Sequence, residues 1–358
     1  MRRLVLQVIL KLGRYAVLPV VGVAGALMLA WLMLLDRYAI AALVTAPILF
    51  SVVTAAFALA LGILLLPSLK DRDFSADETC APGLWAIWKE LDRGFARPRR
   101  TLTINDKFNA SIMEQSRYAG LFAQHVTMTV GLPLLILLDE RAIRAIVAHE
   151  IAHMRLRHTS GGANLYDFVA ASENVLYYAD PERTLTGRVA HLLLHSLTEW
   201  LWAEYRALSR ENELCADGDA GKQVGHDEMA RALVLVEGCG ARITELVMTP
   251  LEKELLGAIK PPVPPLQRMI GLLEDIRAPE QLAAAAAANM KSEQDPEARH
   301  PPFGKRLANL GFADVPSIGK VESSAIDRLL SPKAAGELIT RLDDEWRKRV
   351  RDFVGVDR

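Results

Sequence analysis

The sequence predicts a mainly helical protein with a small β-sheet and an N-terminal hairpin of apolar helices. Two long charge-free runs open the chain, and helical periodicity dominates the remainder. Only residues 100–130 alternate Thr, Val and Ile in the way that is typical of strands. The chain has 358 residues, of which 51% are hydrophobic, so it can bury one large core or two modest ones.

The charge balance excludes one class of partner. Lysine and arginine number 42 against 43 aspartates and glutamates, for a net charge of -1. This gives no electrostatic reason to expect a nucleic-acid partner. The three cysteines, Cys80, Cys215 and Cys239, are scattered and odd in number, so we expect reduced, buried thiols and a reducing compartment.

The N-terminal hairpin is predicted from two apolar runs. Ala16 to Leu35 is twenty residues without a charge, which as a helix would be roughly 30 Å long. Asp36 and Arg37 interrupt, and residues 38–69 are charge-free again. The apolar core of a cleaved signal peptide would be only about 7–15 residues and would lack a second run. We therefore expect two transmembrane helices.

Basic residues predict the orientation of this hairpin, because they concentrate on the cytoplasmic side of membranes. They flank its two ends, and one lies in its turn: Arg2, Arg3, Lys11, Arg14, Arg37, Lys70 and Arg72. We expect a multi-pass protein of the bacterial inner (cytoplasmic) membrane. Both termini and the domain after residue 70 would be cytoplasmic, and the lipid bilayer would be a partner.

The rest of the chain divides into further elements. An amphipathic helix is expected around Trp85, Trp88 and Leu91, followed by two or three short strands in "RRTLTINDKFNAS" and "HVTMTVGLP". Asp139 is a plausible N-cap for a helix that runs to His158 and stops at Gly161 and Gly162.

The later part of the chain is also expected to be helical. One helix is predicted from about Arg188 to Ala216, ending near Gly218 and Gly221. A proline-rich break follows at residues 259–265, and residues 324–350 predict a charged pair of C-terminal helices. Between them, residues 283–288 form a low-complexity alanine helix.

The candidate chemistry begins at "HEIAH". His149 and His153 are four residues apart, so on a helix they share a face and can bind one metal ion. Glu150 lies about 100° round the helix, where it can reach a water molecule activated by that metal. A metal satisfies three polar groups on an otherwise apolar helix. The alternative is an unmetallated polar patch.

A second stretch, "SRENELCAD", offers the third ligand that a catalytic zinc needs. Glu213 can bind the metal, and Asp217 lies four residues later on the same face, where it can orient a ligand imidazole. Arg210 precedes Glu213 by three residues and is on the same side. The alternative is a solvated face of mixed charge.

These motifs together resemble a known family. "HEIAH", "SRENELCAD" in the pattern S-R-x-x-E-x-x-A-D, and "HPPFGKRL" resemble the integral-membrane zinc metallopeptidases that include the HtpX heat-shock protease and the CAAX prenyl endopeptidases. The likeness extends to "NASIM" and "TVGLPLLILLDERAIRAIVAHEIAH", and it covers about residues 100–310. Residues 160–200 carry several charges and no third apolar run, unlike the HtpX branch.

The resemblance implies a zincin-type (gluzincin) metallopeptidase domain with one Zn²⁺ per chain. The implied zinc ligands are His149, His153 and Glu213, and Glu150 is the implied catalytic base. Asp217 would support a ligand imidazole from behind, and Arg210 would brace the site. His300 would lie at its mouth as an oxyanion donor, a gate or a capping residue.

We therefore expect three regions: a membrane anchor at 1–70, a metallopeptidase core at 71–250, and a C-terminal helical region with the HPP motif at 251–358. The expected activity is zinc-dependent cleavage of peptide bonds in an unfolded or membrane protein, as in membrane protein quality control. Substrate would extend along an edge strand near residues 125–130, "HVTMTV".

Two other functional classes remain open. A non-proteolytic zinc-binding chaperone or assembly scaffold would use the metal as a structural staple, with His300 as the candidate fourth ligand. A soluble aminopeptidase-like enzyme is disfavoured by the apolar hairpin.

Other features are expected to have no catalytic role. His191 and His195 are four apart without an intervening glutamate, and they favour packing. Cys215 has no evident histidine partner, and the glycines near Gly161 lack the lysine of a phosphate loop.

Overall fold

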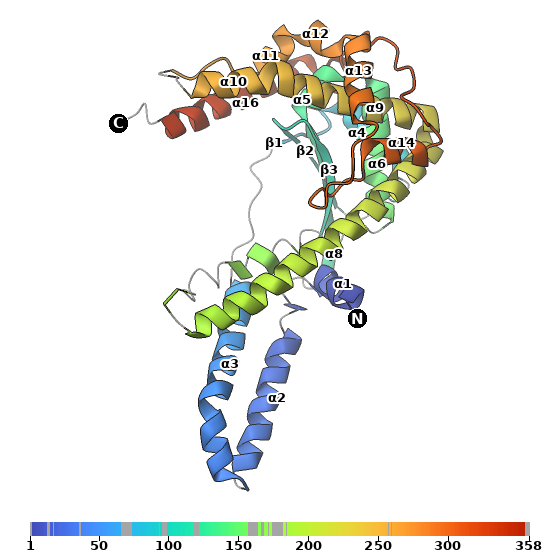
Figure 1. Cartoon of the computed structure of the whole chain (residues 1–358). Coiled ribbons are helices and arrows are strands. Elements are labelled where there is room, and N and C mark those ends of the chain that lie inside the picture. The colour runs from blue at the N-terminus through green and yellow to red at the C-terminus, as the bar shows by residue number, and fades with distance from the viewer. Residues whose placement is uncertain are drawn as a thin grey trace. The chain divides into compact units, whose positions relative to one another are not determined.

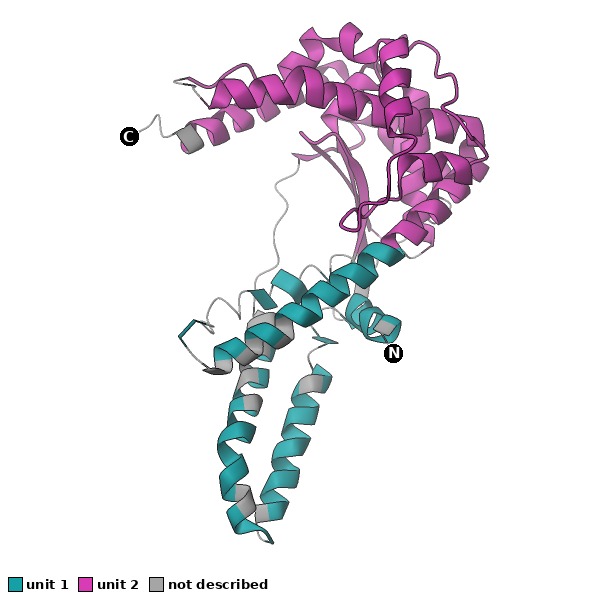
Figure 2. Ribbon diagram, in the orientation of Figure 1, with its two compact units in different colours: residues 1–71, 116–122, 159–208 teal, residues 72–115, 123–158, 209–358 magenta. Residues whose placement is uncertain are grey.

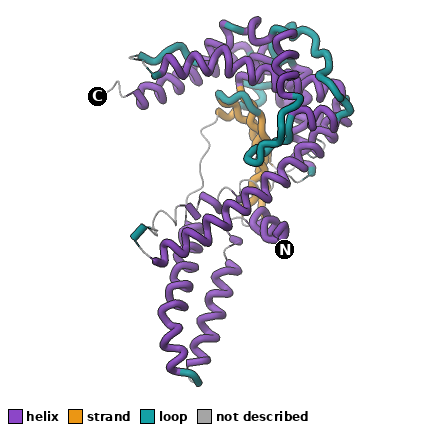
Figure 3. Tube along the Cα trace, viewed as in Figure 1, coloured by secondary structure: helices purple, strands orange, loops and turns teal. Residues whose placement is uncertain are grey.

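A computed structural model describes most of the chain, including "HEIAH", "SRENELCAD" and "HPPFGKRL". The described residues are 2–12, 15–16, 18–35, 37–65, 74–92, 94, 99–117, 122–156, 164–165, 168–170, 172–173, 182–183, 185–256, 258 and 260–354. They form two compact units (Figure 2), of which unit 1 comprises residues 1–71, 116–122 and 159–208, and unit 2 comprises residues 72–115, 123–158 and 209–358. Helices dominate both units, as predicted, and the strands gather in one sheet (Figure 3).

Unit 1 contains helices α1 (Arg2–Leu12), α2 (Leu18–Leu35) and α3 (Ala39–Leu65), together with the first part of α8 (Leu185–Val224). A small core joins α1, α3 and α8 with residues 165, 168 and 169. Its buried members are Leu6, Ile9, Ala60, Leu165, Phe168, Val169 and Leu201. The amphipathic α1 is a helix separate from α2, and it was not predicted from the apolar run at residues 16–35.

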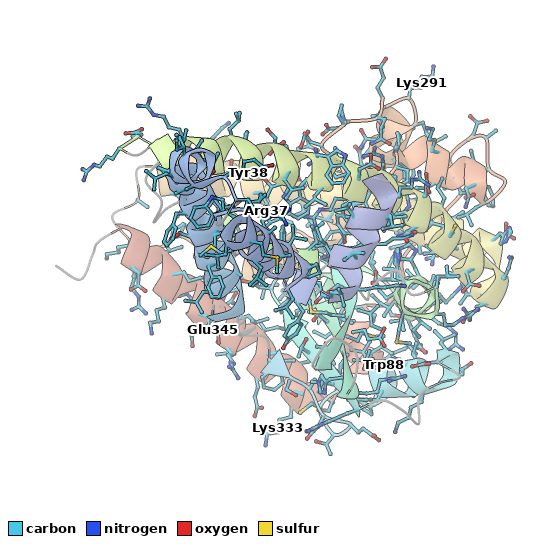
Figure 4. All side chains as sticks on the ribbon, turned by 90° about the horizontal axis from the view of Figure 1, so that it is seen from below. Arg37, Tyr38, Trp88, Lys291, Lys333 and Glu345 are labelled. Atoms are coloured by element: carbon cyan, nitrogen blue, oxygen red, sulfur yellow. The ribbon has the colours of Figure 1, made fainter. Side chains whose placement is uncertain are left out.

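The predicted hairpin is formed by α2 and α3, which pack against each other (Figure 1). Arg37 and Tyr38 lie at its turn (Figure 4), and the indole of Trp31 donates a hydrogen bond to Thr45 Oγ1 at 3.2 Å. Both helices expose large apolar side chains. They include Leu18, Val23, Leu27, Leu29, Leu32, Met33, Leu34, Ile40, Leu43, Val44, Ile48, Phe50 and Phe57.

The expectation of two membrane-spanning helices over residues 16–35 and 38–69 is not supported. Among the described residues, no helix combines the length and the apolarity that crossing a bilayer requires. Residues 66–69 lie outside the described part of the chain.

Unit 2 is built on a four-stranded sheet with the order β1-β2-β4-β3. The strands are β1 (Phe74–Ser75), β2 (Arg99–Asn105), β3 (Ala110–Arg117) and β4 (Phe122–Gly131). β1 pairs antiparallel with β2, and β2 pairs parallel with β4 from Arg99↔His125 to Asn105↔Gly131. This register places Leu102, Ile104, Val126, Met128 and Val130 in the core. The strands predicted in both segments are confirmed.

Helices from before and after residue 225 pack around this core. Those before residue 225, besides α8, are α4 (Pro82–Leu91), α5 (Leu132–Leu137) and α6 (Glu140–Arg155). The C-terminal ones are α9 (His226–Ile243), η2 (Thr244–Met248), α10 (Thr249–Leu255), α11 (Pro265–Gly271), α12 (Leu273–Arg277), α13 (Pro279–Asn289), α14 (Phe303–Asn309), α15 (Ile326–Leu329) and α16 (Pro332–Val354). α9 packs against both α6 and α13. Trp88 of the predicted amphipathic helix is fully buried on α4 (Figure 4).

The end of α8 corrects one expectation. The helix does not stop near Gly218 and Gly221 but continues to Val224. Gly221 serves packing instead, because a Cβ there would lie 2.5 Å from His226 Cδ2. The helix ends at Gly225, whose φ of 98° favours glycine.

Two further expectations concern glycines and cysteines. The glycines expected to stop α6, Gly161 and Gly162, lie outside the described residues, and α6 itself ends at Arg155. All three cysteines are free, but Cys215 is exposed rather than buried. Cys239 is buried, and burial raises the pKa of its thiol to about 12.

Candidate metal centre

The site is built on α6, whose start is fixed by Asp139. The Asp139 carboxylate accepts a hydrogen bond from the Ala142 amide at 2.9 Å, which confirms the predicted N-cap. Arg231 of α9 donates to the same carboxylate through both terminal nitrogens, at 3.2 and 2.5 Å. Buried apolar residues then hold the helix against the core, so the orientation of the face that carries His149 and His153 is set by packing.

Three side chains bring donor atoms to one point. His149 Nε2 and His153 Nε2 are 3.1 Å apart, and Glu213 of α8 places its carboxylate oxygens 3.1 Å from His153 Nε2 and 3.6 Å from His149 Nε2. The 3.1 Å between the two imidazole nitrogens is close to the edge of about 3.3 Å that a tetrahedral zinc site has when the metal lies about 2.0 Å from each ligand, and a different Glu213 oxygen faces each imidazole. Two imidazole nitrogens and a carboxylate oxygen also form a donor set that zinc prefers. The residues therefore fit a zinc ion.

The electrostatics of the cluster favour a cation. Burial alone would lower the pKa of His149, but the carboxylates of Asp217 and Glu213 raise it to about 10. Burial would raise the pKa of Glu213, yet the neighbouring imidazoles and Arg306 hold it well below its usual range. Two carboxylates with little access to solvent thus draw positive charge to the point where the donors meet.

Asp217 occupies the position expected of it behind a ligand. Its Oδ1 lies 2.9 Å from His149 Nδ1, on the side of the ring opposite to the nitrogen that faces Glu213. A carboxylate there fixes which ring nitrogen carries the proton and leaves Nε2 free to bind a metal.

Glu150 lies beside the donor cluster but outside it. The backbone amide of Ile112 donates a hydrogen bond to Glu150 Oε2 at 3.1 Å. Burial raises the pKa of Glu150, and the charges of His149 and His153 oppose that shift. The carboxylate is thus held in one orientation by the sheet.

The amide that holds Glu150 belongs to β3, and this corrects the expected edge strand. β4, which contains "HVTMTV", lies inside the sheet between β2 and β3. The strand order could not be read from the alternation pattern, because both strands alternate similarly. The edge nearest Glu150 is β3.

His300 and Arg210 lie at the solvent side of the cluster. The His300 side chain is 67% exposed, and its Nδ1 lies 3.0 Å from Glu213 Oε2. Arg210 donates to the Ala298 carbonyl at 2.9 Å, so it holds the segment that precedes His300. Arg210 thus braces a loop next to the site.

Arg306 is a site residue that the sequence analysis missed. It lies on α14, and its Nε and Nη2 are 2.8 and 2.7 Å from the two carboxylate oxygens of Asp217. Its Nη2 is also 3.3 Å from Glu213 Oε2. A charge imbalance in the sequence could have pointed to Arg306. Two acidic residues predicted to face a buried site need a positively charged partner, and "HPPFGKRL" contains this arginine.

The discounted histidine pair lies elsewhere. His191 and His195 are exposed on the part of α8 that belongs to unit 1, with parallel rings 5.5 Å apart. In the described part of the chain, the three-residue group of His149, His153 and Glu213 is the one that could hold a metal ion.

Comparisons with known proteins agree with the motifs. Residues 96–311, more than half of the chain, match the family model of peptidase family M48. The crystal structure of Ste24p from S. mikatae matches with 15% sequence identity and a TM-score of 0.34, over 81% of this chain and 62% of that chain. No curated protein matches. The family resemblance inferred from "HEIAH" and "SRENELCAD" is confirmed: the chain belongs to peptidase family M48.

Proposed function

We propose that this protein is a zinc-dependent metalloendopeptidase that binds one Zn²⁺ through His149, His153 and Glu213. The observation that carries the proposal is the convergence of three side chains. The two imidazole nitrogens lie 3.1 Å apart, close to the edge of a tetrahedral zinc site, and the two Glu213 oxygens lie 3.1 and 3.6 Å from them. The contact of Asp217 with His149 and the placement of Glu150 next to the donors also support it.

The proposed chemistry divides between the metal and Glu150. When bound, zinc would make a water molecule acidic enough to lose a proton near neutral pH and would polarise the peptide carbonyl. Glu150 accepts that proton and later delivers it to the leaving amine. The hydrogen bond from the Ile112 amide restrains the Glu150 carboxylate during both transfers.

The proposed substrate is an extended polypeptide. β3 pairs with β4 on one side only, and the Ile112 amide points toward Glu150 rather than into the sheet. A peptide that lies along this edge would be held mainly by main-chain hydrogen bonds, which tolerate many sequences. Unfolded proteins and loops of membrane proteins, as encountered in quality control, are the substrate class that fits such recognition.

The hairpin of α2 and α3 is proposed to contact a lipid bilayer. Large apolar side chains on both helices are exposed, and Arg37 occupies the turn. Contiguous apolar surface of this kind is typical of interaction sites with membranes or proteins. The basic residues before α2 and after α3 support a cytoplasmic location for the metallopeptidase part as a further element of the proposal.

Metal analysis combined with a cleavage assay tests the enzymatic proposal. Purified full-length protein should contain one zinc per chain and should cleave an unfolded casein. A chelator should abolish cleavage, and added zinc should restore it. Stoichiometric zinc without any cleavage would instead favour the chaperone or scaffold, and protein without zinc affinity would contradict both.

Membrane association is tested separately by fractionation. We expect the protein to stay with membranes after alkaline carbonate extraction and its C-terminal part to be protected from protease in intact spheroplasts. Recovery of all the protein in the soluble fraction would contradict the proposed lipid contact and would favour the soluble aminopeptidase-like reading.

A further inference from the structure

Arg306 joins two carboxylates of the metal centre. Its guanidinium donates bidentate hydrogen bonds to the Asp217 carboxylate, with nitrogen–oxygen distances of 2.8 and 2.7 Å. The same Nη2 reaches Glu213 Oε2 at 3.3 Å. Asp217 in turn meets His149 Nδ1 at 2.9 Å, so a continuous chain of contacts runs from α14 through α8 to α6.

Asp217 needs this partner in order to keep its position. The carboxylate is fully buried, and it lies one helical turn from a second buried carboxylate, that of Glu213. Burial removes water from both carboxylates, and without a cation nothing would offset that cost or their mutual repulsion. The paired nitrogens of a guanidinium match both oxygens of a carboxylate and fix its plane, whereas the ammonium group of a lysine acts as a point charge.

We propose that Arg306 is a positioning residue for the metal site. It orients Asp217, and Asp217 orients the His149 ring so that Nε2 faces the metal. This inference rests on the proposed zinc site. It assigns no contact between Arg306 and the metal, and it explains why an arginine from α14 lies against the ligand helix.

Zinc affinity of the full-length protein, measured by competition with a chromophoric chelator, tests the proposal without an activity assay. We expect Arg306→Met to weaken zinc binding about 10- to 100-fold, the usual effect of removing a group that orients a ligand. Asp217→Asn should have a similar effect, and the double variant should be little weaker than either single one, because both remove the same chain of contacts. Additive losses would overturn the proposal.

Arg306→Lys separates geometry from charge. If orientation is what Arg306 supplies, the lysine variant will restore little of the affinity, and the visible spectrum of its cobalt-substituted form will differ from that of the wild type. Full restoration by lysine would show that charge alone matters and would overturn the positioning role.

Arg155→Met is the matched control. Arg155 also links α6 to α8, through Asp219 at 3.0 Å, but it touches none of the three donors. It should leave zinc affinity unchanged, and melting of the zinc-free proteins shows whether any variant fails to fold. Wild-type zinc affinity in Arg306→Met would overturn this inference alone, whereas a wild-type protein without zinc affinity would overturn the zinc site as well.

Discussion

The amide of Ile112 donates a hydrogen bond to Glu150 Oε2 at 3.1 Å, so the edge strand of the sheet is joined directly to the helix that carries both histidines. Strand β3 and helix α6 are separated in sequence by β4 and α5. The strand proposed to hold the substrate therefore also fixes the proposed base, and a shift of this strand would displace both.

Replacing Ile112 with proline tests this link. The Ile112 N–H is not used to pair strands, so proline is compatible with this edge position, but it removes the donor to Glu150. We expect kcat to fall about 10- to 100-fold, with zinc content unchanged. Ile112→Val retains the amide and should retain nearly all activity. Equal kinetics for the proline and valine variants would show that the hydrogen bond has no catalytic role.

Glu150→Gln should separate metal binding from proton transfer. Glutamine has nearly the same shape but cannot accept the proton, so we expect zinc to stay bound and cleavage of casein to fall at least about 100-fold. Glu140→Gln, on the first turn of the same helix, is the control and should cleave normally. Wild-type cleavage by Glu150→Gln would show that another group is the base.

His300→Ala distinguishes the three roles considered for this residue. Because His300 is largely exposed and contacts the ligand carboxylate, we expect zinc to be retained while kcat falls about 100- to 1,000-fold, as for loss of an oxyanion donor. A gate would instead raise kcat/KM. A capping residue would lower the melting temperature without changing the kinetics, so steady-state kinetics and a thermal melt decide among the three.

The metal motif could be predicted from sequence because its ligands depend on local geometry. His149 and His153 share a face through the helical repeat alone, and the same repeat relates Glu213 to Asp217. Asp139 was recognisable as an N-cap for the same reason, since capping depends on residues within one turn.

What could not be predicted depends on long-range packing. The position of β3 at the sheet edge follows from strand order, which alternation does not encode. Arg306 reaches Asp217 only because α14 folds back on α8 across 89 residues of sequence. Gly221 was misread as a helix stop because its packing against His226 is visible only in three dimensions.

Protonation of Asp139 should lower the stability of the folded protein in acid. Burial alone would raise its pKa, but hydrogen bonds from Arg231 and Ala142 hold it below the ordinary value of about 4. A lowered folded pKa stabilises the protein above pH 4, and the contribution is lost as pH falls through the folded pKa. Asp139→Asn keeps an N-cap but loses the ion pair, so we expect it to cost about 2 kcal/mol at pH 7.

The difference between wild type and Asp139→Asn should shrink as pH falls below about 4, when the wild-type carboxyl is also protonated. Melting temperatures at pH 7, 5 and 3 measure this. Asp352→Asn, at an exposed position of α16, should be neutral throughout. A difference that does not depend on pH would show that Asp139 acts only as a cap.

Gly131 should tolerate no side chain. It joins β4 to α5, and a Cβ there would lie 1.6 Å from the Lys107 carbonyl oxygen, while its amide donates to the Asn109 carbonyl at 2.8 Å. Backbone atoms cannot yield as a flexible side chain can, so Gly131→Ala should destabilise unit 2 by about 3 kcal/mol. Gly336→Ala is the matched control, because open space surrounds Gly336 within α16 and alanine favours helix, and it should stabilise by about 0.5–1 kcal/mol. Denaturant unfolding of the two variants should therefore shift in opposite directions, and a neutral Gly131→Ala would mean that the turn at residues 106–109 does not pack against the end of β4 as described.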